Sequence, residues 1–200
     1  MGSLRLIDEY WRLIIAELMI SGAMAMTSLD HLNDRPSPWV QRFVPQIARD
    51  GEILDLACGR GRHARWLAGE GWRVEAVDRD SAALAGLAGV AGVRVRVADL
   101  EHGVWPYAGR HFAGIVVANY LHRPLLPLIE EALGEGGVLI YETFMVGNER
   151  FGRPSNPDFL LRPQELLEVA CAAGLRVLAF EEGEVTTPKP AMVQRIAALR

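Results

Sequence analysis

A short apolar run that ends in a glycine-bearing turn constrains the fold more than any other stretch of this chain. The run from 53 to 56 can form a buried strand, and Gly59 and Gly61 follow it closely. Trp66 and Leu67 then fall where the buried face of a helix would place them. Glycine permits backbone angles that a Cβ opposes, and the start of a helix presents free N–H groups to the same spot. The stretch therefore predicts strand, tight turn and helix, an arrangement suited to holding a nucleotide.

Two kinds of cofactor use such a turn, and the glycine spacing alone does not separate them. Gly59-x-Gly61-x-x-Ala64 satisfies the fingerprint of dinucleotide-binding proteins, and Asp78 stands about where their ribose-binding acid is expected. Asp55, inside the predicted strand, favours the other kind, because its carboxylate would repel a pyrophosphate and attract a cation. S-adenosylmethionine (SAM) carries a sulfonium and an ammonium group and has no phosphate. Asp55 therefore favours SAM as the cofactor at this turn.

The run Asp55-x-Ala57-x-Gly59-x-Gly61 resembles the first motif of the class I (Rossmann-like) SAM-dependent methyltransferases, which reads acid-x-Gly-x-Gly-x-Gly. Ala57 replaces the first glycine, a small-for-small change that should narrow the turn slightly. The Cys-Gly-x-Gly-Arg turn is similar to that of the small tellurite-resistance and thiopurine-type methyltransferases. The resemblance implies an α/β fold with a doubly wound, mostly parallel seven-stranded sheet, an antiparallel last strand and helices on both faces. It begins near Ser28, so we expect an N-terminal amphipathic extension at 1–27 and a methyltransferase domain at 28–200.

Apolar periodicity predicts the order of elements along the chain. The most continuously apolar strand, 112–118, should be central, and the alternating strand 93–97 should lie at an edge. The stretch 145–162 has no period, and because compact domains seldom keep so long a loop without a use, we interpret it as a lid that faces the substrate. Further strands are expected at 53–56, 72–77, 138–144, 175–180 and 191–199, and helices from Pro38, after Gly61, from Ser81, at 125–133 and at 163–173.

The ends of the predicted strands supply the candidate cofactor residues. Asp78, at the end of the second strand, can accept both ribose hydroxyls, while Asp80 is better placed to cap the next helix. The resemblance implies that Asp99 takes the exocyclic amine of adenine and that Leu100 packs on the ring; an ordinary turn aspartate is the alternative for Asp99. The predicted cofactor-binding set is Asp55, Ala57, Gly59, Gly61, Asp78, Arg79, Asp99, Leu100 and Asn119.

Methyl transfer from a sulfonium is an in-line displacement with a neutral leaving group, so it needs few catalytic side chains. The segment after the central strand should lie against the methyl group, which makes His122 and Tyr120 the catalytic candidates. The alternative for His122 is a residue that opens the next helix and bonds only backbone. Asn119-Tyr120-Leu121-His122 differs from the Asn-Pro-Pro-aromatic motif of base-amine methyltransferases, which disfavours amino methylation of adenine or cytosine.

Candidate acceptor-binding residues lie at the end of the fifth strand and in the 145–162 stretch. Strand alternation lets only one of two neighbouring residues at that strand end point inward. A loop arginine could neutralise an acidic substrate, and asparagines could orient one. This predicted set is Tyr141, Glu142, Asn148, Arg153 and Asn156.

Composition limits the classes of function. A chain of 200 residues with a net charge of −4 fits one domain and argues against a broad nucleic-acid footprint. Cys58 and Cys171 have no metal-ligand spacing, so we expect no metal site and reduced thiols in a cytoplasmic protein. Residues 4–20 predict an amphipathic helix and not a membrane span. This helix is either an upstream extension or an element that caps the pocket or docks to a partner or to a second copy in a homodimer.

The sequence thus predicts transfer of a methyl group from SAM to a small-molecule acceptor. The methyl is received by an oxygen, a sulfur or an oxyanion, and S-adenosylhomocysteine (SAH) is the product. Three alternatives remain open. They are an RNA or protein methyltransferase that acts with a partner, a SAM-binding protein without turnover, and an NAD-dependent oxidoreductase, which rests on the Gly59-x-Gly61-x-x-Ala64 match alone.

Overall fold

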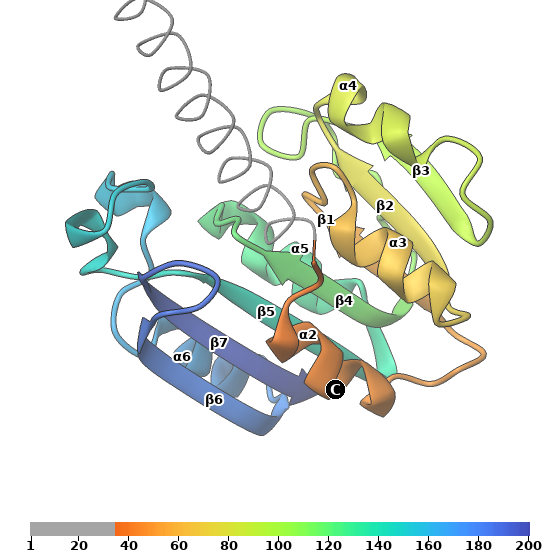
Figure 1. Ribbon diagram of the computed structural model, residues 1–200. Coiled ribbons are helices and arrows are strands. Elements are labelled where there is room, and N and C mark those ends of the chain that lie inside the picture. The colour runs from red at the N-terminus through yellow and green to blue at the C-terminus, as the bar shows by residue number, and fades with distance from the viewer. Residues whose placement is uncertain (1–34) are drawn as a thin grey trace, which may run out of the picture. The chain divides into compact units, whose positions relative to one another are not determined.

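A seven-stranded sheet runs through the part of the chain that the computed structural model describes, residues 35–200 (Figure 1). Its strand order is β3-β2-β1-β4-β5-β7-β6. Strands β3, β2, β1, β4 and β5 pair in parallel, whereas β7 is antiparallel to both β5 and β6. The doubly wound α/β fold with an antiparallel last strand is therefore confirmed. The amphipathic helix expected at 4–20 lies outside the described residues.

The strands alternate with helices along the chain. The strands are β1 (Glu52–Leu56), β2 (Arg73–Asp78), β3 (Val93–Val97), β4 (Phe112–Ala118), β5 (Leu133–Phe144), β6 (Arg176–Val185) and β7 (Ala191–Leu199). The helices are α2 (Pro38–Phe43), α3 (Arg62–Gly69), α4 (Ser81–Leu84), α5 (Leu126–Glu131) and α6 (Glu165–Ala172). Short 3-10 helices occupy Val44–Gln46, Ala85–Leu87, Arg123–Leu125, Asn148–Arg150 and Pro157–Phe159. Among residues 35–200, no helix is both long enough and apolar enough to cross a membrane.

The predicted positions of two strands in the sheet are confirmed. β4 lies between β1 and β5, as its continuous apolar sequence indicates, and β3 forms one edge. Other predicted boundaries were wrong. The helix expected at 125–133 ends at Glu131, because Leu133 already pairs with Phe112 in the sheet. β6 extends to Val185, since an edge strand pairs through its backbone while its charged side chains remain in solvent.

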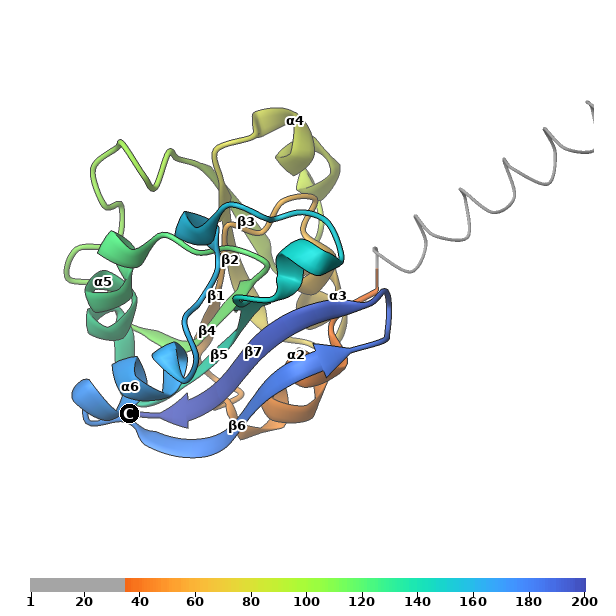
Figure 2. The same ribbon diagram turned by 90° about the vertical axis from the view of Figure 1, so that its left-hand side faces the viewer.

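Apolar side chains form a core on each face of the sheet. α2 and α3 cover one face, and α5 and α6 cover the other (Figure 2). The helix expected from Pro38 is α2, and Ser37 caps it, because its Oγ accepts the N–H of Trp39 and Pro38 follows at the first helical position. Trp39 is buried, and its indole N–H donates to the carbonyl of Ile196 in β7. The two cores hold the carboxyl ends of the central strands in fixed positions.

Candidate functional site

The turn after β1 contains three residues in the left-handed region of backbone conformation. Ala57, Gly59 and Gly61 have φ values of 53°, 55° and 73°. A Cβ on Gly61 would come within 2.4 Å of the Leu87 side chain, so only glycine fits there. A Cβ on Gly59 would meet nothing within 4 Å, so the backbone there faces open space. Gly61 therefore serves packing, while Gly59 leaves room for close approach of a ligand.

Asp78, at the end of β2, ties the turn to the next strand. Its Oδ2 accepts the N–H of Gly59 at 2.8 Å, and its Oδ1 accepts the N–H of Asp80 at 2.9 Å. Asp80 in turn caps α4, because its Oδ1 accepts the N–H groups of Ala82 and Ala83 at 2.9 and 3.1 Å. The prediction that Asp80 caps the next helix is thus confirmed. Asp78 keeps acceptor capacity toward the space beside the turn.

Asp55 is buried behind the turn, with 1% of its surface exposed. Its Oδ2 accepts the N–H of Ala64 at 2.9 Å, which joins β1 to the first turn of α3. Burial raises the pKa of this carboxyl to about 7, against the lowering effect of the Ala64 hydrogen bond and of the Arg62 charge. A cationic group bound beside the turn would favour the ionised form of Asp55.

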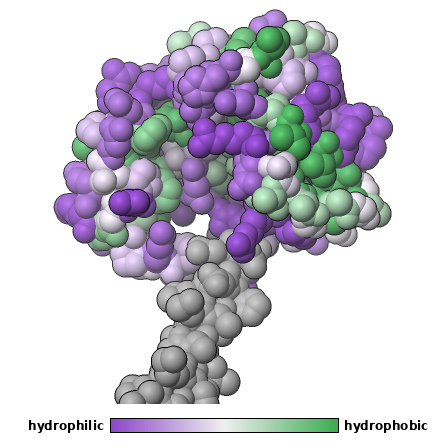
Figure 3. Space-filling model, turned by 90° about the horizontal axis from the view of Figure 1, so that it is seen from above, coloured by the Kyte–Doolittle hydropathy of each residue, from purple (hydrophilic) through white to green (hydrophobic). Residues whose placement is uncertain are grey.

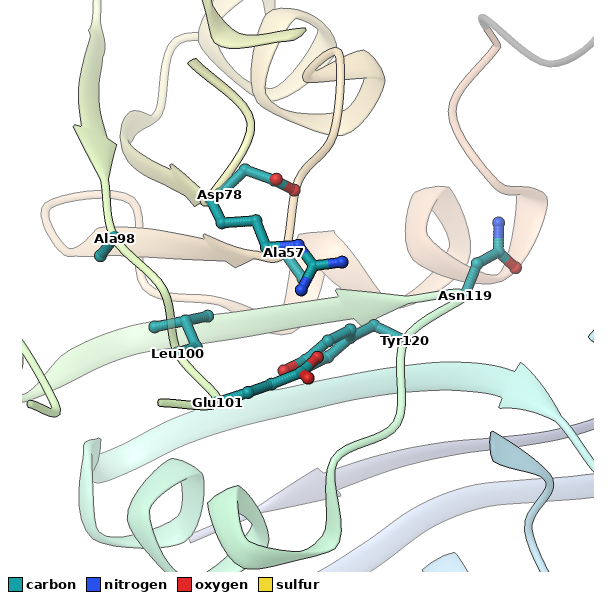
Figure 4. A pocket seen from close by; sticks show the side chains of 8 residues that line it. Ala57, Asp78, Ala98, Leu100, Glu101, Asn119 and Tyr120 are labelled. Carbon is teal, nitrogen blue, oxygen red and sulfur yellow. The ribbon is translucent and has the colours of Figure 1, made fainter. Parts of the chain in front are cut away.

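A cavity of about 200 Å³ opens at the carboxyl ends of β1, β2, β3 and β4 (Figure 4). Such a position is where doubly wound sheets hold their ligands. The cavity is lined by Ala57, Asp78, Arg79, Ala98, Leu100, Glu101, Asn119 and Tyr120. It brings together many of the predicted cofactor residues, which lie far apart in the sequence. Asn119 takes a left-handed conformation with φ 58°, and its N–H donates to the carbonyl of Glu142.

Asp99 lies beside the cavity but its carboxylate is occupied by its own turn. Oδ1 accepts the N–H groups of Glu101 and His102 at 2.9 and 3.1 Å, and Oδ2 lies 3.2 Å from Nδ1 of His102. These hydrogen bonds hold the pKa of Asp99 below its usual value. The geometry is that of a turn aspartate, and the adenine contact of Asp99 stays a prediction. Glu101, which sequence analysis missed, lines the cavity two residues further on.

Tyr120 presents a phenol to the cavity. Its hydroxyl is buried and lies beside the Glu101 side chain (Figure 4). Burial, and then the negative charge of Glu101, raise the pKa of this phenol. Tyr120 therefore remains protonated at neutral pH and is suited to donating a hydrogen bond, not to accepting a proton.

The other predicted residues near the cavity have structural partners. The carbonyl of His122 accepts the N–H of Leu125 where a 3-10 helix begins, and His122 is not part of the cavity wall. Tyr141 is buried, and its hydroxyl donates to the carbonyl of Tyr120 at 3.0 Å. Glu142 instead pairs with Arg195, with 3.2 Å between Oε2 and Nε. The two neighbours thus contact different surroundings, as strand alternation predicts.

The 145–162 segment is folded onto β7 by buried polar groups. Asn148 is 2% exposed; its Nδ2 donates to the carbonyl of Pro154, and its Oδ1 accepts the N–H of Met192. Asn156 accepts the N–H of Asp158 and so begins a 3-10 helix. Arg153 is exposed. Both asparagines therefore bind backbone of their own chain, and Arg153 and Asn156 are exposed while Asn148 is buried.

Arg123 and Glu165 anchor the end of this segment, and sequence analysis missed both. Nε of Arg123 lies 2.7 Å from Oε1 of the buried Glu165, and its terminal nitrogens donate to the carbonyls of Asp158 and Leu160 at 2.8 Å. Glu165 also accepts the N–H of Arg162. The chain after β4, which carries Tyr120, is thereby joined to the end of the 145–162 segment.

Hydrophobic side chains also reach the surface of this segment. Val146, Phe151 and Phe159 are 46%, 37% and 50% exposed. The view from above shows a face that is hydrophilic over much of its area and interrupted by hydrophobic patches (Figure 3). Among residues 35–200, no group of histidine, cysteine and acidic side chains is placed to hold a metal ion.

Comparisons with known proteins agree with this geometry. Residues 53–137 match the family model described as "Methyltransferase domain". No curated protein matches the sequence. Among solved structures, the chain is similar to TehB from Haemophilus influenzae, with 18% identity, a TM-score of 0.64 and coverage of 81% of this chain and 61% of TehB. The chain thus spans less than two thirds of that protein.

Two further structures are similar over more of their length. A TehB-like SAM-dependent methyltransferase from Corynebacterium glutamicum shows 21% identity and a TM-score of 0.63, covering 89% of this chain and 95% of that one. The 1,6-didemethyltoxoflavin-N1-methyltransferase of Burkholderia thailandensis, solved with 1,6-didemethyltoxoflavin and SAH, shows 19% identity and a TM-score of 0.62, covering 96% and 89%. At these identities the likeness shows a shared fold.

Proposed function

We propose that this chain, a SAM-dependent methyltransferase of the class I fold, transfers the methyl group of SAM to a small-molecule acceptor that ionises near neutral pH. The cavity at the carboxyl ends of the central strands carries the proposal, because Asp78 and Leu100 line it together with Ala57 of the turn, as an adenosyl group requires. The small-molecule acceptor of the similar Burkholderia enzyme supports the choice of acceptor class. We place the reaction in the cytoplasm, where the thiols of Cys58 and Cys171 stay reduced.

The residues of the cavity fit the parts of SAM. Asp78 accepts the ribose hydroxyls, since its carboxylate faces the cavity while still holding the turn. Gly59 lets the ligand approach the backbone, and Leu100 packs on the base. Asp55 responds to the positive charge: a cationic donor beside the turn lowers the pKa of its carboxyl from about 7 and so gains a favourable charge interaction.

SAM supplies an electrophilic methyl group when bound, and the protein aligns the acceptor and excludes water. The pKa of the Tyr120 phenol is raised, so Tyr120 is not suited to act as a general base, and the carboxylates of Asp78 and Glu101 are the basic groups in the described part of the cavity wall. His122 lies outside that wall. An acceptor that is already anionic, such as a thiolate or an oxyanion, needs no base. The aromatic residues Phe151 and Phe159, which are exposed on the 145–162 segment, are available to contact its apolar part.

The test is a screen of thiols, phenols, carboxylates and inorganic oxyanions for SAH production by the purified chain. We expect turnover with one of these classes, and loss of turnover in Asp78→Ala. The matched control is Asp80→Ala, which removes the neighbouring helix cap and leaves the cavity wall unchanged. Turnover with tRNA or a protein acceptor, and with none of the small molecules, would contradict the proposed acceptor class.

A further inference from the structure

The chain between β3 and β4 reaches the cavity without a helix to hold it. Residues 98–111, here called the 98–111 segment, form turns only. Ala98, Leu100 and Glu101 of this segment line the cavity, and Figure 4 shows them along one side of it. A helix usually connects parallel strands and packs on the sheet. The position of this side of the cavity therefore depends on the side chains that fix the 98–111 segment.

Tyr107 is the buried anchor of the segment, with 1% of its surface exposed. Its ring packs edge-on against the rings of Trp105 and Phe112, with 5.3 Å between ring centroids in each pair. The guanidinium groups of Arg96 and Arg110 lie 5.5 and 5.4 Å from the centroid of the Tyr107 ring. A cation at this distance from an aromatic face is attracted to it. These contacts fix Tyr107 against the sheet.

Glu75 in β2 holds the charges around this anchor, and its side chain is completely buried. Nε of Arg96 lies 2.8 Å from its Oε1, and Nη1 of Arg110 lies 3.5 Å from the same oxygen. The Tyr107 hydroxyl is 3.4 Å from this oxygen. Burial raises the pKa of Glu75, but the hydrogen bonds from Arg96 and Arg94 hold that pKa below its usual value. Glu75 is therefore ionised at neutral pH and attracts both guanidinium groups that flank Tyr107.

Two arginines contact the same pair of carboxylates but come from different parts of the chain. Arg94, on β3, contacts Glu75 through Nε and lies 2.6 Å from Glu52 through Nη2. Arg110, near the end of the 98–111 segment, lies 2.8 Å from Glu52 and 3.5 Å from Glu75. Arg94 therefore joins strand to strand, whereas Arg110 joins the segment to the strands.

We propose that Arg110 is a positioning residue for the cofactor. Together with Glu75 it fixes Tyr107 on the sheet. The anchored segment in turn holds Leu100 and Glu101 in the cavity wall. If the segment were loose, cofactor binding would have to order it, and the affinity would fall by that cost. Arg110 is not part of the cavity lining, so it acts only through the segment. The proposal rests on the proposed function, which places an adenosyl cofactor in this cavity.

The experiment compares Arg110→Met with Arg94→Met by calorimetric titration with SAH. Both exchanges remove contacts to the same two carboxylates, so we expect similar losses of stability. Only Arg110→Met releases the segment. We therefore expect it to weaken SAH binding by about three- to tenfold, and Arg94→Met to weaken it by less than about twofold. Arg110→Lys should bind SAH more tightly than Arg110→Met, because it keeps a positive charge beside Glu75.

Hydrogen exchange supplies a readout that a loss of stability alone does not change. Arg110→Met should speed amide exchange in residues 98–111 of the unliganded chain, since it removes the tie between the segment and the strands. SAH should then slow exchange in the segment by a larger factor than in wild type, because ordering of the segment and binding of the ligand are coupled. Arg94→Met should show the wild-type factor.

The outcomes distinguish this proposal from the proposed function. Equal SAH affinity in folded Arg110→Met and Arg94→Met, or equal exchange of the segment in Arg110→Met and wild type, overturns the positioning role while SAH binding itself stands. Failure of the folded wild-type chain to bind SAH refutes the cofactor assignment instead. Thermal unfolding establishes that each variant is folded. If Arg110→Met does not fold, Arg110→Lys decides the question: weaker SAH binding than in Arg94→Met supports the role, and equal binding overturns it.

Discussion

Ala57 holds a left-handed backbone conformation in which a side chain is unfavourable. Its φ of 53° is close to the 55° of Gly59 in the same turn. A Cβ in this region costs about 1–2 kcal/mol, while glycine loses about 0.5–1 kcal/mol more backbone entropy on folding. We therefore predict that Ala57→Gly raises the free energy of unfolding by about 0.5–1 kcal/mol in urea denaturation. Gly59→Ala should lower it by about 1 kcal/mol, and the same sign for both exchanges would contradict this account of the turn.

Asp78 is predicted to contribute to cofactor affinity, in contrast with its neighbour Asp80. Hydrogen bonds to a charged group are worth about 1.5–3 kcal/mol, so Asp78→Ala should weaken SAH binding at least about tenfold. Asp80→Ala removes the cap of α4 and should cost about 1 kcal/mol of stability without changing SAH affinity. Calorimetry with both variants measures the difference. Equal SAH affinity in the two variants would contradict the proposal that Asp78 binds the ribose.

The buried Asp55 should make stability depend on pH. Its pKa is about 7 in the folded chain, above the ordinary value of 3.8, so the folded state binds more protons than the unfolded state between these values. Stability then falls as pH rises through this window, by up to about 1.4 kcal/mol per pH unit from this group. Asp55→Asn keeps an acceptor for the N–H of Ala64 but does not titrate. We therefore expect the free energy of unfolding of Asp55→Asn, minus that of wild type, to be larger at pH 8 than at pH 5. If this difference is the same at both pH values, Asp55 does not titrate in this range.

At the scale of elements, the Arg123–Glu165 pair joins the chain after β4 to the start of α6. Glu165 has 4% of its side chain exposed, so removal of Arg123 leaves this buried carboxylate with only the longer 3.4 Å ion pair to Arg162 and the N–H of Arg162. We predict that Arg123→Met lowers the free energy of unfolding by about 2–4 kcal/mol and makes the 145–162 segment sensitive to limited proteolysis. Arg153→Met, an exposed exchange within the segment, should change stability by less than about 0.5 kcal/mol. Similar proteolysis of the two variants would show that the pair does not anchor the segment.

The elements themselves could be predicted from sequence to the extent that apolar residues mark them. The strand, turn and helix around Gly59 follow from local pattern, and β4 is central because its apolar run is continuous. β6 was predicted too short, because its outer half is charged and pairs with β7 through backbone hydrogen bonds and polar side-chain contacts such as Gln194 to Glu182. Charged edge strands lack the alternation that sequence analysis depends on.

Site residues that lie at strand ends could be predicted from the sequence. Contacts between residues far apart in the sequence could not. Asp78, Leu100 and Asn119 end or follow strands, so their gathering in one cavity follows from a parallel sheet. The Arg123–Glu165 pair joins residues 42 positions apart, and no local pattern indicates it. The hydrogen bonds that Asp99 makes within its own turn depend on the backbone conformation there, which the order of residues leaves open.

At the scale of the whole molecule, the sheet order and the antiparallel β7 set this chain apart from the dinucleotide-binding arrangement that its glycine spacing also permits. The order β3-β2-β1-β4-β5-β7-β6 places one cavity over β1 and β4, with Asp55 buried behind it. A buried carboxyl at that point favours a cationic ligand over a pyrophosphate. The fold and the charge of the site therefore both favour SAM over a dinucleotide.

The most direct measurement is calorimetric titration of the purified chain with SAH and, separately, with NAD. The account predicts binding of SAH, loss of at least about tenfold in affinity in Asp78→Ala, and no binding of NAD. Binding of NAD by a folded chain that does not bind SAH would contradict it.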